Sequence, residues 1–187
     1  MTISPSHKVV VSISEGIATV TINNPAANTW DLESLPALKA VVNALNDMSD
    51  IRALVITGQG EKFFSAGADL NQFATGDATA AQAMGDAFGG AFETLADYRG
   101  VSIAAINGYA MGGGLEVALA CDIRIAERHA ALALPEAKVG LLPCAGGTQR
   151  LTQLVGEGWA KRIILCGERI SAEKALSLGL VEEVVDS

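Results

Sequence analysis

Short apolar runs alternate along the chain with longer segments in which apolar residues recur at helical spacing. Residues 9–13 and 17–22 are β-rich runs on either side of a turn at residues 14–16 (SEG), so they predict a hairpin. Residues 53–57 (ALVIT) and 102–106 (SIAAI) are continuous apolar runs of the length expected for buried strands. Further short strands are expected at residues 123–126, 130–134 and 180–185.

The helical pattern is clearest in residues 31–48, where leucines and valines recur at intervals of three and four. Thr29 or Asp31 would cap this helix. Ser171 would cap a last short helix that ends at Gly179. Other helical segments are expected at residues 80–98, 149–155, 157–166 and 172–178, with loops at 71–79 and 141–148. Strands that alternate with helices predict a single α/β domain over residues 1–187.

Composition and charge narrow the class of protein further. Half of the 187 residues are hydrophobic, which fits a packed domain, and a formal net charge of -8 argues against nucleic acid or an anionic membrane as partner. Residues 101–120 are apolar, but Asn107, four glycines and Glu116 within them argue against a membrane span. Three cysteines without a C-x-x-C pair and no visible secretory h-region favour a reducing, cytoplasmic location.

Several common motifs are absent from the sequence. Gly108 and residues 112–114 do not make G-x-G-x-x-G, and no G-K-[ST] follows, so neither a dinucleotide fold nor a P-loop is predicted. His7 and His129 are the two histidines and no G-x-S-x-G occurs, which disfavours a Ser-His-Asp hydrolase. No cluster of His, Cys and carboxylate residues has metal-ligand spacing, so no metal is expected.

Residues 107–122 (NGYAMGGGLEVALACD) combine a glycine-rich helix entrance with one carboxylate in an apolar run. Gly112, Gly113 and Gly114 leave the first backbone N–H groups of the helix open to a ligand, and the helix dipole adds positive character there. Glu116 is either an ordinary first-turn glutamate or an acid–base group. Its apolar neighbours favour the second interpretation as much as the first, because burying an unpaired charge without a function would be costly. The sequence therefore predicts a place for developing negative charge beside an acid–base group.

Two other segments offer matching chemistry. Glu136 follows Pro135 and is either a glutamate that stabilises a helix start or the second of two carboxylates that divide acid and base roles. The small residues at 65–69 (SAGAD) either allow close packing, with Asp69 capping a turn, or expose backbone N–H groups to a ligand. One N–H group from this segment and one from the glycine-rich helix would make an oxyanion hole.

Four motifs, taken together, resemble the crotonase superfamily, the enoyl-CoA hydratase/isomerase family. They are FFSAGADL at residues 63–70, IAAINGYAMGGGLEVALACDIRIA at 103–126, LPEAKVGLLPCAGGTQRL at 134–151 and GERISAEKALSLGLVEEVV at 167–185. The resemblance implies a spiral of repeated ββα units that assembles as homotrimers or dimers of trimers. It also implies that the chain is the core domain without the C-terminal helical part of the family, which completes the acyl pocket.

For the site, the resemblance implies an acyl-CoA thioester as substrate, with no metal or redox cofactor, because coenzyme A is part of the substrate. The backbone N–H groups of Ala68 and Gly113 would hold the thioester oxygen. Glu116 would act as base toward a water that adds at Cβ, and Glu136 as the acid that protonates Cα. The residues expected to touch the acyl-CoA are Ala66, Gly67, Ala68, Asp69, Leu70, Gly112 and Gly113.

Having both glutamates favours a hydratase that converts a trans-2-enoyl-CoA to the 3-hydroxyacyl-CoA, as in fatty-acid degradation. Cys144 stands where hydratases usually have glycine, and it is expected to lie behind the Glu136 side of the site. Ala26 and Ala27 stand where the family often has a Lys or Arg that reaches CoA phosphate. Two alternatives stay open: double-bond isomerisation on the same fold, and a subunit that binds acyl-CoA without catalysis.

Overall fold

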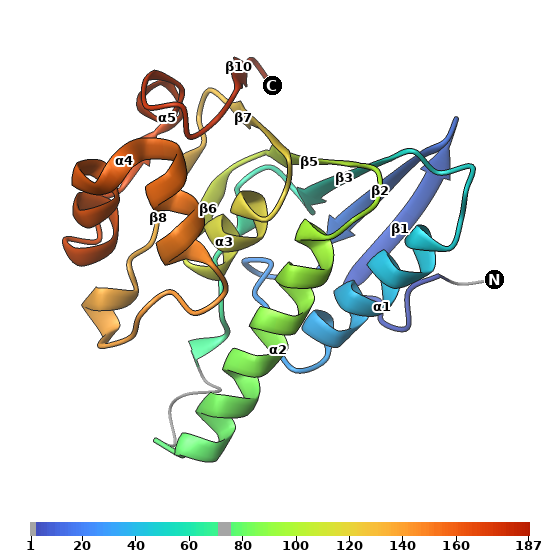
Figure 1. The fold of residues 1–187 in the computed structure, drawn as a ribbon, viewed down its shortest axis with the longest axis horizontal. Coiled ribbons are helices and arrows are strands. Elements are labelled where there is room, and N and C mark those ends of the chain that lie inside the picture. The colour runs from blue at the N-terminus through green and yellow to red at the C-terminus, as the bar shows by residue number, and fades with distance from the viewer. Residues whose placement is uncertain (1–2, 71–75) are drawn as a thin grey trace.

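Parallel strands form the central layer of the molecule. In the computed structural model, which describes residues 3–70 and 76–187, a six-stranded sheet has the order β1-β2-β3-β5-β7-β10 (Figure 1). β1 and β2 run antiparallel, and the other neighbours in this sheet run parallel. The strands are β1 (Val9–Ser14), β2 (Ile17–Ile22), β3 (Ala53–Gly58), β5 (Val101–Ile106), β7 (Ile123–Glu127) and β10 (Glu183–Val185).

A smaller four-stranded sheet accompanies the first and has the order β4-β6-β8-β9. Its strands have two or three residues each: β4 (Phe63–Ser65), β6 (Tyr109–Met111), β8 (Ala131–Ala133) and β9 (Ile170–Ser171). The helices are α1 (Ser34–Asn46), α2 (Ala78–Ala96), α3 (Gly113–Leu119), α4 (Gly147–Leu165) and α5 (Ala172–Ser177), with a 3-10 turn, η2, at Glu136–Val139. Among the described helices, none is long and apolar enough to cross a membrane.

A strand–strand–helix unit repeats along the chain. β3, β4 and α2 form one unit, β5, β6 and α3 form the next, and β7, β8 and α4 form a third. The first strand of each unit joins the six-stranded sheet and the second joins the four-stranded sheet. This arrangement confirms the expected α/β spiral of ββα units.

The N-terminal hairpin forms where the sequence predicts it. Ser14 pairs with Ile17, and the two residues between them, Glu15 and Gly16, have φ angles of 53° and 79°. Positive φ at both central residues is the geometry of a type I′ turn, whose twist matches that of the flanking strands. The turn therefore fixes the register of β1 against β2.

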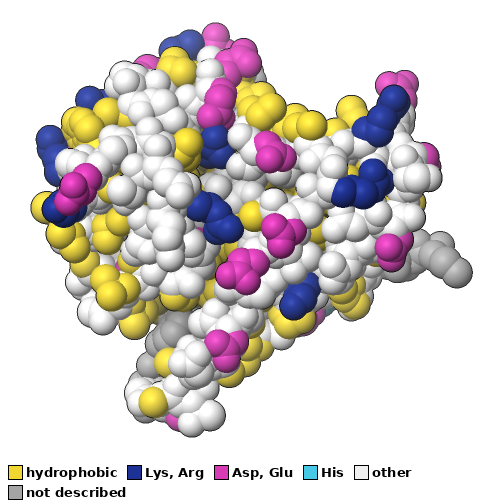
Figure 2. Space-filling model, in the orientation of Figure 1, with side chains coloured by type: hydrophobic (Ala, Val, Ile, Leu, Met, Phe, Trp, Pro, Cys, Tyr) yellow, Lys and Arg dark blue, Asp and Glu magenta, His cyan; other side chains and the backbone are white. Residues whose placement is uncertain are grey.

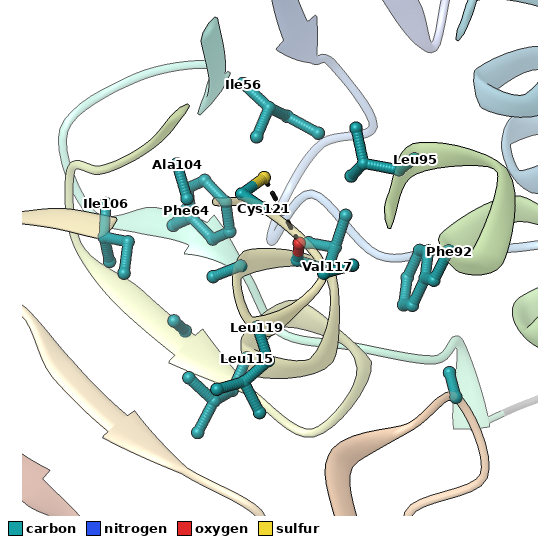
Figure 3. Close-up of a cluster of buried hydrophobic side chains, with 14 of the residues drawn as sticks. Ile56, Phe64, Phe92, Leu95, Ala104, Ile106, Leu115, Val117, Leu119 and Cys121 are labelled. Atoms are coloured by element: carbon teal, nitrogen blue, oxygen red, sulfur yellow. Dashed lines mark hydrogen bonds between the residues drawn. The ribbon is translucent and has the colours of Figure 1, made fainter. Parts of the chain in front are cut away.

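The helix α3 is packed into the centre of the fold, since all seven of its residues are buried. Figure 3 shows its Leu115, Val117 and Leu119 in one cluster with Phe92 and Leu95 of α2 and with side chains from the strands. Full burial of one such side chain contributes about 1.5–3 kcal/mol relative to leaving it exposed. The segment that carries the glycine-rich entrance is thus held firmly on every side.

The sequence does not predict three of the short strands, because runs of two or three residues are too short to show a periodic pattern. β4, β6 and β9 all belong to the smaller sheet, and each is fixed by its neighbours rather than by its own sequence. β6 is the most consequential of them. It leads directly into Gly112, so the glycine-rich stretch begins as a strand and becomes a helix within three residues.

The start of α1 lies later than expected, at Ser34 rather than at residue 31. Its N-cap is Glu33, which makes no side-chain capping bond. Asp31 instead ties the preceding turn, because its Oδ1 accepts hydrogen bonds from the backbone N–H groups of Glu33 (3.0 Å) and Ser34 (2.8 Å). The expected cap at Thr29 or Asp31 is therefore wrong in position, although Asp31 satisfies the N–H groups ahead of the helix.

The expected loops and helix breaks are partly correct. The loop expected at residues 71–79 falls largely on residues 71–75, which lie outside the described residues, while Asp77 caps α2 by accepting from the N–H of Thr79 at 2.8 Å. α4 begins at Gly147, inside the expected loop, and its path breaks at Gly156, where φ is 74° and ψ is 162°. Ser171 caps α5 as predicted, accepting from the N–H of Lys174.

Candidate active site

A cavity of about 390 Å³ opens between the helix entrance of α3 and the loops that surround it. Both candidate glutamates line it, although they are 20 residues apart in the sequence. The other lining residues are Thr29, Ala66, Ala68, Asp69, Leu70, Phe88, Gly112, Gly113, Pro135, Lys138, Val139, Leu141, Leu142 and Cys144. Apart from Asp69 and Lys138 the wall is mostly apolar, which suits a site that excludes water from a few placed polar groups.

Glycines bring the two loops of the site together. A Cβ at Gly114 would lie 2.1 Å from the carbonyl oxygen of Ser65, so α3 contacts the end of β4 directly through backbone. Gly67 has a φ of 86°, and a Cβ there would lie 3.0 Å from the nitrogen of Gly113. Larger side chains at these positions would hold the two loops apart. The sequence marks both glycines, but their contact comes from the fold.

Ala68 and Gly113 present unused backbone donors to the cavity. An isolated parallel bridge joins Trp30 and Ala68, and it uses the carbonyl of Gly67 (2.8 Å) and the N–H of Asp69 (3.0 Å). The N–H of Ala68 is left out of that bridge, and the N–H of Gly113 is the first of its helix. Neither has an acceptor among the residues that the structure describes. Because both residues line the cavity, these two N–H groups are the candidates for the predicted oxyanion hole.

Glu116 lines the cavity and is held in place by hydrogen bonds. Its side chain is buried, with the residue only 2% exposed, and its Oε1 accepts hydrogen bonds from the backbone N–H groups of Ala145 (2.8 Å) and Gly147 (2.9 Å). Burial raises the pKa of Glu116, whereas the two N–H groups and the positive charge of Arg150 lower it. Two fixed donors on one oxygen leave the other oxygen available to a water or substrate.

Glu136 lies across the cavity in a different environment. It starts the 3-10 turn η2 after Pro135, and its Oε1 faces Gly112, since a Cβ on that glycine would lie 3.1 Å from it. Its Oε2 is buried and has no hydrogen-bond partner among the described residues. Burial, together with the nearby charge of Glu116, raises the pKa of Glu136 to about 7. Near neutral pH this carboxyl is therefore present both with and without its proton.

Comparison with known proteins identifies the family of this fold and site. The model of the enoyl-CoA hydratase/isomerase family matches residues 12–187. The chain belongs to this family, within the crotonase superfamily. Among curated members of the family, it is 39% identical over 181 residues to the short-chain-enoyl-CoA hydratase of Clostridium acetobutylicum, covering 96% of this chain and 69% of that protein.

Solved structures of family members agree with the fold. The structure of Pseudomonas aeruginosa DspI is 68% identical, with a TM-score of 0.96, over 97% of this chain and 75% of that one. The structure of an enoyl-CoA hydratase from Bacillus anthracis is 38% identical, with a TM-score of 0.93, over 96% of this chain and 70% of that one. The chain thus spans about 70% of the length of the relatives named here.

Six of the seven residues that are expected to touch the acyl-CoA line the cavity. Ala66, Ala68, Asp69 and Leu70 line the cavity on one side and Gly112 and Gly113 on the other. Gly67 is not among the described residues that line it. Its backbone is packed instead against β6, and a Cβ there would lie 2.6 Å from the carbonyl oxygen of Met111. Gly67 therefore allows the backbone of residues 65–69 to lie close to β6, without lining the cavity itself.

Cys144 lies closer to the cavity than expected, because it lines the wall itself. The residue as a whole is exposed. The apolar surroundings of the sulfur, together with the charges of Glu116 and Glu136, raise the pKa of the Cys144 thiol to about 11. It follows Pro143 and immediately precedes Ala145, whose N–H holds Glu116. The thiol is therefore neutral at the wall of the site.

Some lining residues could not be found from the sequence. Phe88 comes from the middle of α2, and a Cβ at Gly113 would lie 2.6 Å from its ring, so the phenylalanine covers the glycine entrance. Leu141 and Leu142 are exposed at the rim, with Leu142 at 68%. An exposed leucine in a loop carries no local signal of a site. Only the folded chain, which brings α2 and the loop before α4 to the same cavity, reveals these positions.

Proposed function

We propose that this family member is an enoyl-CoA hydratase, which adds water across the double bond of a trans-2-enoyl-CoA and gives the 3-hydroxyacyl-CoA. The observation that carries the proposal is that Glu116 and Glu136 line one cavity together with Ala68 and Gly113. The backbone N–H groups of the latter two have no acceptor among the described residues. The names of relatives as hydratases, about 40% identical over nearly the whole chain, support the same reaction.

The first part of the reaction is stabilisation of charge on the substrate. Addition of water at Cβ turns the thioester into an enolate, whose negative charge lies on the thioester oxygen. The N–H groups of Ala68 and Gly113 would donate hydrogen bonds to that oxygen, and the dipole of α3 adds positive potential at Gly113. Removing one such donor costs about 2.7–4 kcal/mol of transition-state stabilisation in comparable sites.

The second part is transfer of two protons. Glu116 would take a proton from the water as its oxygen bonds to Cβ, and the two N–H groups on its Oε1 would hold it in place for this. Glu136 would deliver its own proton to Cα, for which a pKa of about 7 is well suited near neutral pH. Both glutamates line one cavity, so the water oxygen at Cβ and the proton at Cα would be added from the same side of the double bond. A proton passed from Glu116 to Glu136 resets the site.

The proposed reaction uses no metal and no redox cofactor, because the acid, the base and the oxyanion donors are all supplied by the chain. We also propose that the protein acts in the cytoplasm as a homotrimer or a dimer of trimers, in line with the assembly expected from the family. Its net charge of -8 supports a small-molecule substrate rather than nucleic acid. Sedimentation of the purified protein tests the assembly.

The experiment that tests the function follows the products. With a trans-2-enoyl-CoA, a hydratase removes the conjugated thioester absorbance and forms 3-hydroxyacyl-CoA, which chromatography identifies. With a 3-enoyl-CoA, an isomerase would instead create that absorbance by moving the double bond. Formation of the 3-hydroxy product supports the proposal. Turnover of the 3-enoyl substrate alone, or tight acyl-CoA binding without any product, would contradict it.

A further inference from the structure

The loop that holds Glu116 is folded around the side chain of Arg150. The Nη1 of Arg150 donates a hydrogen bond to the carbonyl oxygen of Ala145 at 3.1 Å. Gly146 has a φ of 92°, and a Cβ there would lie 2.1 Å from the same Nη1. The guanidinium therefore lies directly against the backbone of residues 145 and 146, at a position that only glycine leaves open.

The same loop faces Glu116 with its N–H groups. Ala145 donates to Oε1 of Glu116 at 2.8 Å and Gly147 donates to it at 2.9 Å. Arg150 lies in the first turn of α4, and its own N–H bonds to the carbonyl of Gly146 at 2.9 Å. Next to it, Leu151 is fully buried and fixes this turn in the core. One short segment thus contacts a guanidinium through a carbonyl and a carboxylate through two N–H groups.

The charge of Arg150 also acts on Glu116 directly. Glu116 is almost completely buried, and burial raises its pKa, whereas the guanidinium of Arg150 lowers it. The titratable groups that line the cavity together with Glu116 are Asp69, Glu136, Lys138 and Cys144. On the other side, Glu93 of α2 lines a surface hollow together with Arg150. Of the positive charges around the site, it is that of Arg150 that lowers the pKa of Glu116.

We infer that Arg150 is a positioning residue for the base. It holds residues 145–147 in the conformation that directs two N–H groups at Oε1 of Glu116, and it favours the ionised carboxylate that can accept a proton from water. The catalytic consequence rests on the proposed hydratase function. The structural and electrostatic consequence does not, because the hydrogen bonds and charges that carry it are present in the protein without substrate.

Titration of Glu116 tests this inference without any turnover. The intact chain is labelled with carbon-13 at glutamate carboxyls, Glu116 is assigned with E116Q, and its pKa is followed by NMR in the wild type, R150Q, R150K and R162Q. R162Q is the matched control, because it removes a positive charge from the same helix, where exposed Arg162 pairs with half-buried Glu168. We expect the pKa of Glu116 to rise in R150Q, to rise less in R150K, and to stay unchanged in R162Q. An unchanged pKa of Glu116 in R150Q overturns the inference.

R150K keeps the test decisive if R150Q does not fold. Lysine keeps the charge but lacks the planar fork that reaches the Ala145 carbonyl. We therefore expect faster hydrogen exchange at the N–H groups of Ala145 and Gly147 in R150K than in the wild type. Exchange as slow as in the wild type would contradict a positioning role.

Kinetics then separate this inference from the proposed function. If the wild type hydrates an enoyl-CoA, R150Q should lower kcat with little change in KM, by roughly ten- to a hundredfold for a displaced base. The acid limb of the kcat/KM profile should move to higher pH in R150Q but not in R162Q. If the wild type hydrates nothing, the proposed function fails, and the NMR titration still decides the role of Arg150.

Discussion

Glu116 and Glu136 line the same cavity with opposite hydrogen-bonding states. Oε1 of Glu116 accepts two backbone N–H groups at 2.8 and 2.9 Å, whereas the buried Oε2 of Glu136 has no partner among the described residues. Hydrogen bonds from N–H groups favour a carboxylate, and burial without donors favours a carboxylic acid. Burial raises the pKa of both carboxyls, but at Glu116 the backbone N–H groups and the charge of Arg150 oppose that rise. We therefore expect Glu116 to act as the base and Glu136 as the acid.

The unusual pKa of Glu136 has a consequence for stability. It is raised to about 7 from 4.5, so the folded chain binds this proton more tightly than the unfolded chain. Glu136 consequently favours the folded state below its unfolded pKa, and this contribution is lost as the pH rises through about 7. We expect E136Q to have a higher free energy of unfolding than the wild type at about pH 8, by on the order of 1–3 kcal/mol after allowing for partial solvent exposure.

Urea unfolding across the pH range measures this difference. Because both proteins share every other carboxyl group, their difference isolates Glu136. The gain in E136Q should shrink as the pH falls and vanish near about pH 4, where Glu136 is protonated in both states. A gain in stability that stays constant from acidic to alkaline pH would show that folding does not raise the pKa of Glu136.

The backbone contact between α3 and β4 should tolerate no side chain at residue 114. A Cβ there would lie 2.1 Å from the carbonyl oxygen of Ser65, so G114A must push the two segments apart. We expect it to destabilise the chain by roughly 1–3 kcal/mol, as overpacking does, and to weaken hydration by separating the N–H groups of Ala68 and Gly113. Thermal unfolding and rate assays measure the two effects.

Gly89 supplies the matched control for that substitution. It lies within α2, and a Cβ there would meet nothing within 4 Å. G89A should leave stability unchanged or raise it by about 0.5–1 kcal/mol, because alanine suits a helix better than glycine. Equal losses of stability in G89A and G114A would argue against a specific contact at Ser65.

Cys144 should react slowly with alkylating reagents despite its exposure. Its thiol pKa is raised to about 11, and the thiolate is the reactive form. In a C166S background, which removes the other exposed cysteine, we expect the alkylation rate to increase with pH throughout the neutral range. Mass spectrometry follows the modification. A rate that is already at its maximum near neutral pH would contradict the environment described for this thiol.

Much of the fold is readable from the sequence because its long elements carry strong patterns. The hairpin, the strands β3 and β5, the break at Gly156 and the cap at Ser171 each depend on local residues, and each appears where expected. The short strands of the smaller sheet do not, since pairing with distant neighbours creates them. The start of α1 was displaced because Asp31 forms a turn with its own following N–H groups.

The site shows the same division. Gly113, Glu116 and Glu136 stand out in the sequence as a charge-holding helix entrance and two carboxylates in apolar surroundings. The sequence does not predict the residues that surround them. Phe88 packs against Gly113, and Arg150 donates a hydrogen bond to the carbonyl of Ala145. Phe88 and Gly113 are 25 residues apart in the sequence. The contact between Arg150 and the carbonyl of Ala145 depends on the left-handed conformation of Gly146 between them. No local pattern encodes them.

The most direct test of the account is the rate of hydration of crotonyl-CoA by the wild type, E116Q and E136Q. Both substitutions keep the shape of the side chain and remove its ability to exchange a proton. Acid or base groups of this kind contribute about 10²–10⁴-fold. We predict that the wild type forms 3-hydroxybutyryl-CoA and that each variant, folded as judged by circular dichroism, is slower by at least about a hundredfold. Wild-type rates in either variant would contradict the division of acid and base between Glu116 and Glu136.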